Sequence, residues 1–318
     1  MDSFIYSLNA TVPVFAIIII GYILKNLNII DDHFASVANK FVFKVCLSVL
    51  VFQDLADTNI RKNFNARYVG FCFLCTLISI LVIWFLAKKL MRDKSEVGAF
   101  VQGAYRSSAA ILGIAFIQNI YGNSGMAPLM IIGSVPLYNI FAVIILTFES
   151  RNKEMVADSS IRIKKALINI LKNPIIIGIF LGLTASFFNI DFPKMIDKTL
   201  SNLAAMASPL ALISIGASFE GRKALAKIKP TVTASFIKLI GLAAVFVPLA
   251  IKLGFRDQEL IAITIMLASP CTPTAYIMTK NMDGDDILAS SIIVTTTLFS
   301  SITLTGWIFI LRVMSLIQ

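Results

Sequence analysis

Long apolar runs, separated by short polar segments, repeat along the whole chain. Most runs hold about 20 residues, which is the length at which an α-helix crosses a hydrocarbon core about 30 Å thick. Helix breakers and charged residues end each run, so the pattern predicts ten transmembrane helices. We expect these spans near residues 4–25, 34–54, 67–90, 97–121, 125–148, 173–190, 195–219, 230–253, 258–281 and 285–312. The pattern therefore predicts an all-α polytopic membrane protein.

Composition and charge agree with this prediction. Hydrophobic residues make up 57% of the 318 residues and charged residues 14%, and the mean hydropathy is +0.83. A soluble domain is less apolar and carries about a quarter charged residues. The net charge of +10 comes from lysines and arginines in short loops, and no basic domain stands apart to bind nucleic acid. Loops after odd-numbered spans hold about twice as many of them as the other loops, so we expect a multi-pass protein of the cell membrane with both termini extracytoplasmic.

The chain offers little for metal or enzyme chemistry. Cys72 and Cys75 form a CxxC pair, but no second cysteine or histidine cluster completes a metal site, and His33 is the only histidine. An intramembrane enzyme would need a metal-binding acid cluster, or a nucleophile with a base, at membrane depth. We therefore expect no metal, no cofactor and no enzyme activity. The first run has no basic segment before it and no small-residue cleavage site after it, so we expect it to remain as a span.

The two halves of the chain resemble each other. Pro13, Gly21 and Asn28-Ile29 match Pro174, Gly182 and Asn189-Ile190 at a constant offset of 161 residues. If each half contains five spans, the second half enters the membrane upside down, which is the inverted-topology repeat of many secondary transporters. The expected divisions are a first repeat (1–149), a basic cytoplasmic linker (150–172) and a second repeat (173–318).

Inverted-repeat transporters bind their cargo where two corresponding helices are broken near the bilayer midplane. In the second half the break is predicted within LASPCTPTAYIMTK, residues 267–280, because Pro270 and Pro273 each remove a backbone donor. The corresponding stretch of the first half is GAYRSSAAILG, residues 103–113, where Gly103 and a serine pair weaken the helix. Unwound backbone at this depth must be buried or line a wet cavity, so a functional crossover is expected, with a patched proline kink as the alternative.

Arg106 is predicted to lie near the bilayer centre. It follows Ser95 by 11 residues, a rise of about 16 Å along a helix, and a charge at that depth costs at least about 3 kcal/mol. Arg106 either binds an anion directly or clamps free carbonyls at the break. Lys44 and Lys238 are also expected to be buried cations, with scaffold and site roles both open. All acidic residues fall in loops or at span ends, so we expect a cavity without carboxylates, which favours an anionic cargo.

Six motifs in order carry a resemblance to a known family. They are FVQGAYRSSAAILG (100–113), VPLYN (135–139), KNPIIIGIFLG (172–182), SPLALISIGASF (208–219), IKLIGLAAVFVPL (237–249) and ASPCTPTAYIMTKNMDGDDILAS (268–290). Over essentially its whole length the chain resembles the auxin efflux carrier family, in particular its short bacterial members.

The resemblance implies ten spans in two inverted five-span halves, with spans four and nine crossing as broken helices and transport by an elevator-type mechanism. It implies small carboxylates such as malonate or malate as cargo for bacterial members, and auxin for plant members. Carried over to this chain, the crossover residues are Arg106, Ser107 and Ser108 in span four, and Pro270, Cys271, Thr272, Pro273 and Thr274 in span nine. The chain departs from the family at Ser108, where Asn is frequent, and at Ser48, where Pro is. At Val51 plant members carry a polar residue that faces the substrate.

The leading prediction is a secondary carrier of small organic anions. Arg106 would pair with the charge of the cargo, the serines and threonines of the crossing would donate hydrogen bonds, and Tyr138 and Asn139 would line the site from span five. Alternatives are export of a larger aromatic carboxylate, a sodium-coupled carrier of the same fold class, a channel and a non-transporting receptor. Expected partners are the cargo, the lipid bilayer, a coupling proton or sodium ion, and a second copy of the chain in a homodimer.

Overall fold

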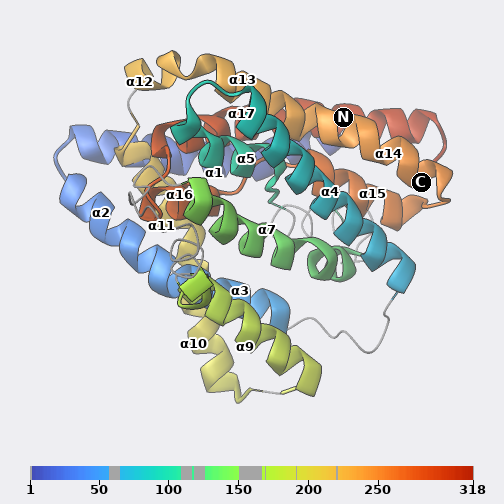
Figure 1. Ribbon diagram of the computed structural model, residues 1–318, viewed down its shortest axis with the longest axis horizontal. Coiled ribbons are helices and arrows are strands. Elements are labelled where there is room, and N and C mark those ends of the chain that lie inside the picture. The colour runs from blue at the N-terminus through green and yellow to red at the C-terminus, as the bar shows by residue number, and fades with distance from the viewer. Residues whose placement is uncertain are drawn as a thin grey trace.

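The described part of the chain is helical throughout. Figure 1 shows the computed structural model, which describes residues 2–56, 65–108, 117, 126–149, 167–168, 170–190, 192–219 and 221–317, with side chains from residue 12 onward except Gly221. Most of the predicted linker, and the residues of span four after Ser108 apart from Ile117, lie outside these ranges. No strand occurs in the described ranges.

The helices begin and end close to the predicted span limits. They are α1 (Asp2–Asn26), α2 (Asp32–Phe41), the π-helical turn η1 (Val42–Cys46), α3 (Leu47–Ala56), α4 (Ala66–Leu90), α5 (Val97–Tyr105), α7 (Ala127–Glu149), α9 (Pro174–Phe188), α10 (Lys194–Ala205), α11 (Ala207–Ala217), α12 (Gly221–Ala226), α13 (Ile228–Phe236), the π-helical turn η4 (Ile237–Gly241), α14 (Leu242–Lys252), α15 (Asp257–Ala268), α16 (Pro273–Asn281) and α17 (Asp286–Val313).

Six helical segments of the described chain are long and apolar enough to cross a membrane. A seventh is the pair α15 and α16, which is bent by 40° at a short break. Two shorter apolar helices, Val12–Asn26 and Pro174–Phe188, accompany them. The chain is therefore a multi-pass helical membrane protein.

Helices α1 and α9 end in the same kind of turn. Asn28 and Asn189 adopt left-handed backbone angles, with φ of 57° and 48°. The amide of the following isoleucine then donates back into the last turn, from Ile29 to the Leu24 carbonyl and from Ile190 to the Ala185 carbonyl, at 3.0 Å each. Asparagine tolerates this conformation and is a common helix terminator. The Asn-Ile pairs that the sequence matched at an offset of 161 thus have the same local structure.

Two glycines allow close helix packing at equivalent places. A Cβ on Gly21 of α1 would overlap the backbone of Ile213 in α11, and a Cβ on Gly182 of α9 would lie 2.6 Å from the Phe52 carbonyl oxygen in α3. Gly21 and Gly182 are 161 residues apart, and so are Phe52 and Ile213. The two close contacts are therefore equivalent, and each joins one half of the chain to the other.

The helices pack as two groups. The first, which we call the panel group, contains α1, α2, α3, α9, α10 and α11, with α3 against α9 and α1 against α11. The second, the core group, contains α4, α5, α7 and α13 to α17, with α4 against α7 and α14 against α15. In Figure 1, α9 and α10 lie at the bottom and α13, α14 and α17 at the top. The groups meet where α1 contacts α17, and where α16 contacts α2 and α11.

The core group contains two unwound segments that meet. Helix α5 ends at Tyr105, and Arg106 continues in an extended conformation with φ −70° and ψ 134°. Between α15 and α16, Ser269 and Thr272 are also extended. The Ser108 amide donates to the Pro270 carbonyl at 3.0 Å, and the hydroxyls of Ser107 and Ser269 are hydrogen-bonded. In both pairs the residues are 162 apart, so corresponding positions of the two halves contact each other here.

Candidate functional site

A small cavity of about 50 Å³ lies beside this meeting point. By volume it has room for a few water molecules. Most of its polar side chains come from the core group, whereas α3 contributes three apolar side chains and Asp54, and α11 contributes Ser208. Its lining consists of Leu47, Leu50, Val51, Asp54, Arg106, Ser107, Ser108, Val135, Tyr138, Asn139, Ser208, Thr272, Pro273 and Thr274.

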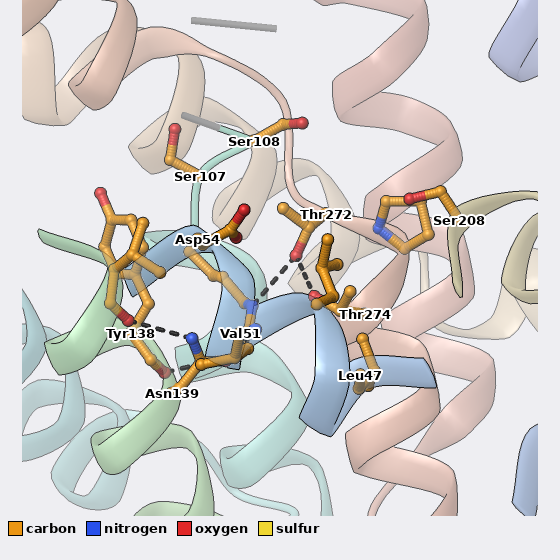
Figure 2. A pocket seen from close by; sticks show the side chains of 14 residues that line it. Leu47, Val51, Asp54, Ser107, Ser108, Tyr138, Asn139, Ser208, Thr272 and Thr274 are labelled. Carbon is orange, nitrogen blue, oxygen red and sulfur yellow. Dashed lines mark hydrogen bonds between the residues drawn. The ribbon is translucent and has the colours of Figure 1, made fainter. Parts of the chain in front are cut away.

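Eight of the ten predicted site residues belong to this lining. They come from three separate stretches of the chain: Arg106, Ser107 and Ser108; Tyr138 and Asn139; and Thr272, Pro273 and Thr274. In Figure 2, Tyr138 and Asn139 lie to one side of Val51, and Thr272 and Thr274 to the other. The fold therefore brings these three predicted groups to one place, whatever their role.

Arg106 is the best-anchored side chain of the site. Only 5% of it is exposed. Its Nη2 donates to Asn139 Oδ1 at 2.6 Å, its Nε donates to Thr272 Oγ1 at 3.0 Å, and its Nη1 lies 3.4 Å from the Tyr138 carbonyl oxygen and 3.2 Å from Met278 Sδ. These acceptors carry no formal charge. Among the described residues, none that holds Arg106 is a carboxylate, so its positive charge is oriented by neutral groups.

The helix α16 starts at the cavity. Pro273 occupies its first position, where a missing amide hydrogen costs nothing, and Thr272 precedes it in an extended conformation. The hydroxyls of Thr272 and Thr274 are 2.7 Å apart and hydrogen-bonded. The amino end of a helix carries a partial positive charge, which adds to the charge of Arg106. The part of span four that follows its predicted break lies, apart from Ile117, outside the described residues.

Pro270 and Cys271, also predicted to be site residues, are not in the cavity lining. The Pro270 carbonyl accepts the hydrogen bond from Ser108, and the Cys271 amide donates to Thr296 Oγ1 in α17 at 3.1 Å. Pro270 therefore contacts the crossing and Cys271 contacts α17, each through its backbone.

Asp54 corrects the prediction of a cavity without carboxylates. It belongs to α3, two residues before the end of that helix, and it lines the cavity together with Val51 and Ser208. Its position near the end of a span made it look like an interfacial residue. A signal was present in the spacing, because Leu47, Leu50, Val51 and Asp54 recur at intervals of three and four and therefore share one helix face.

The two lysines expected to be buried differ from each other. Lys44 in η1 is exposed, so its prediction as a buried cation is wrong, whereas Lys238 in η4 is 0% exposed. Neither lies in the cavity lining. No group of three or more histidine, cysteine or acidic side chains that could hold a metal ion occurs in the described ranges.

A cluster of charged side chains outside the spans connects the segment before α5 to the start of α17. Lys227 Nζ lies 2.6 Å from Glu96 Oε1 and 3.2 Å from Asp285 Oδ2. The other carboxylate oxygen of Asp285 accepts a hydrogen bond from the Leu288 amide in the first turn of α17. Burial alone would lower the pKa of Lys227, but the hydrogen bonds and charges of Glu96 and Asp285 outweigh it, so this pKa lies above its ordinary value. The cluster joins the segment before α5 to the start of α17 and keeps the core group together on that side.

Comparison with known proteins agrees with this architecture. Residues 6–308 match the model of a family described as membrane transport protein. The chain belongs to this family, which is the auxin efflux carrier family that the motifs indicated.

Individual relatives of this auxin efflux carrier family member are distant. An uncharacterized transporter of Methanothermobacter thermautotrophicus is 21% identical over 313 residues, covering 97% of this chain and 99% of the relative. A Rhizobium meliloti protein, provisionally assigned as a malonate transporter, is 25% identical over 308 residues and 94% of both chains. A mouse lysosomal cholesterol signaling protein is 22% identical over 231 residues, which are 67% of this chain and 26% of the mouse protein.

Proposed function

We propose that this protein is a secondary carrier of small organic anions, with malonate or malate as the first candidates. One observation carries the proposal. Arg106 is buried beside a cavity at the meeting point of two unwound segments, and its hydrogen-bond partners among the described residues are neutral. A charge held in this way is costly at membrane depth unless it interacts with something of opposite charge. A carboxylate cargo in the cavity would supply that charge beside Arg106, in addition to Asp54, which lines the cavity from α3.

The remaining lining suits the same cargo. The hydroxyls of Ser107, Ser108, Thr272 and Thr274 can donate hydrogen bonds to carboxylate oxygens, and the start of α16 adds its partial positive charge. The cavity of about 50 Å³ would have to widen to admit malonate, and it would have to widen further for an aromatic carboxylate. The relative assigned to malonate points to the same class of compound.

For the architecture we propose ten spans in two inverted repeats, residues 1–149 and 173–318, joined by the basic linker 150–172. The equal offset of the Gly21 and Gly182 contacts supports this arrangement, as does the pairing of corresponding residues at the crossing. We further propose that the core group moves against the panel group as an elevator, in a homodimer in the cell membrane with both termini extracytoplasmic.

The experiment that tests the carrier proposal compares wild type with Arg106→Ala. A ligand that binds only the native state raises its melting temperature. We expect malonate or malate to raise the Tm of the purified wild type by roughly 2 °C at ten times its Kd. Arg106→Ala should lose both this shift and the uptake of labelled malonate into proteoliposomes.

Lys44→Ala is the matched control, because it removes a cation from an exposed position and should keep both the shift and the uptake. Undiminished uptake by Arg106→Ala would show that Arg106 is only a clamp on the crossing. The anion proposal itself would be contradicted if no carboxylate raised the Tm of the wild type and none were taken up into proteoliposomes.

A further inference from the structure

Lys238 makes contacts that the proposed cargo site does not use. Its side chain is fully buried, and its Nζ donates to the Leu267 carbonyl at 2.6 Å and to the Met266 carbonyl at 3.3 Å. Both carbonyls belong to the last turn of α15. The lysine is carried by the π-helical turn η4, in the middle of the span that packs beside α15.

The break in the helix leaves these carbonyls without helical donors. The donor for the Met266 carbonyl would be residue 270, which is a proline and has no amide hydrogen. The donor for the Leu267 carbonyl would be the Cys271 amide, which instead donates to Thr296 Oγ1 at 3.1 Å. The Lys238 ammonium therefore satisfies two carbonyls that the crossover has freed.

These carbonyls form a site that suits a monovalent cation. The carboxyl end of a helix carries a partial negative charge, and free carbonyls at the end of a broken helix coordinate coupling cations in secondary transporters. Among the described residues, the groups that accept from Lys238 Nζ are carbonyls alone. A lysine ammonium brings one positive charge and three donors to the same position.

We propose that the ammonium of Lys238 is a tethered cation that permanently occupies a monovalent cation site at the end of α15. The cation is then part of the protein and does not have to be bound from solution with each cargo. It follows that the carrier works without sodium, a consequence that rests on the proposed carrier function. The existence of the cation site itself does not rest on it.

The first test opens the site by Lys238→Ala and measures thermal stability without any cargo. We expect a lower Tm than in the wild type, and a rise of roughly 2 °C on adding n-propylammonium or sodium at ten times its Kd, against equal concentrations of choline. The wild type should show no such rise, because its own lysine fills the site. Lys44→Ala should show none either, since it removes an exposed lysine from the equivalent kind of turn.

Lys238→Met separates charge from volume. Methionine fills much of the space of lysine but carries no charge, so this variant should remain unresponsive to n-propylammonium. Equal responses of the alanine, methionine and wild-type proteins to both cations would overturn the site. A wild-type Tm for Lys238→Ala would overturn it as well.

The second test needs no mutation and addresses coupling. Uptake of labelled malonate by wild-type proteoliposomes should change by less than twofold when choline replaces sodium on both sides. A loss of tenfold or more would overturn the claim of sodium independence. If no carboxylate is transported, the proposed function fails, but the response of Lys238→Ala to n-propylammonium still decides whether the cation site exists.

Discussion

Arg106 and Asp54 bring opposite charges to the described lining of the cavity. Arg106 reaches it from the core group, where Asn139 and Thr272 fix its orientation, and Asp54 reaches it from α3 of the panel group. An anionic cargo is attracted by the first and repelled by the second. Because the two charges belong to different helix groups, their distance depends on how the groups sit relative to each other.

Asp54→Asn should therefore tighten the binding of malonate. The substitution keeps the shape of the side chain and removes one negative charge from the cavity lining. Removing about 1 kcal/mol of repulsion corresponds to a roughly fivefold lower Kd. The measurement is a titration of malonate by thermal stabilisation or calorimetry at neutral pH. Weaker binding in Asp54→Asn would mean that the carboxylate helps to hold the cargo instead of opposing it.

Among single residues, the sequence predicted those whose position depends on a helix break. The prolines near Pro273 and the glycine and serines near Arg106 mark the two breaks, so the meeting of these residues could be expected. The position of Asp54, and the difference between Lys44 and Lys238, were not predicted, because they depend on which face of a helix meets its neighbour. Both lysines lie in apolar runs, and only packing shows that one of them contacts α15.

At the scale of helices, glycines control how closely the panel group packs. The backbone oxygen of Phe52 lies where a Cβ of Gly182 would need to be, at 2.6 Å, and the Cβ of Leu55 lies at 3.0 Å. In a membrane such close backbone contacts replace the hydrophobic effect as a source of helix association. Close van der Waals packing at Gly182 therefore contributes to the association of α3 and α9.

Gly182→Ala should destabilise the protein. The added methyl group would press on the backbone of α3, and overpacking of this kind costs about 1–3 kcal/mol. We expect the Tm to fall by several degrees. Gly70→Ala in α4 is the matched control, because no atom lies within 4 Å of the added Cβ and alanine favours a helix. Equal Tm values for the two variants would show that α9 can shift away from α3 without cost.

The limits of the helices were predictable because prolines, asparagines and charges mark them. The Asn-Ile turns after α1 and α9 are one example, and the break between α15 and α16 is another. The π-helical turns around Lys44 and Lys238 were not predicted. Neither VFKVC nor IKLIG contains a proline, and glycine stands only at the last position of IKLIG, so the sequence alone did not mark these wider helical turns.

At the scale of the whole molecule, polar contacts between the two groups are located near α16. Asn281 Nδ2 donates to the Asn39 carbonyl in α2 at 3.3 Å, and Lys280 Nζ lies 3.3 Å from Ser218 Oγ after α11. Contacts within the core group join α16 to α5, where Gln102 Nε2 donates to Thr279 Oγ1 at 3.2 Å. The proposed elevator motion would break the first kind of contact and keep the second.

Cross-linking distinguishes a moving core group from a rigid protein. With Cys46, Cys72, Cys75 and Cys271 replaced, the pair Asn39→Cys and Asn281→Cys places one thiol in each group. Bridging these thiols with mercuric ion should abolish malonate uptake, and an excess of a competing dithiol, which takes the mercuric ion from the protein, should restore it. The pair Gln102→Cys and Thr279→Cys lies within the core group, so bridging it should leave uptake nearly unchanged. If uptake survives a complete bridge between the groups, the cargo crosses without relative movement of α2 and α16, and the elevator proposal is wrong.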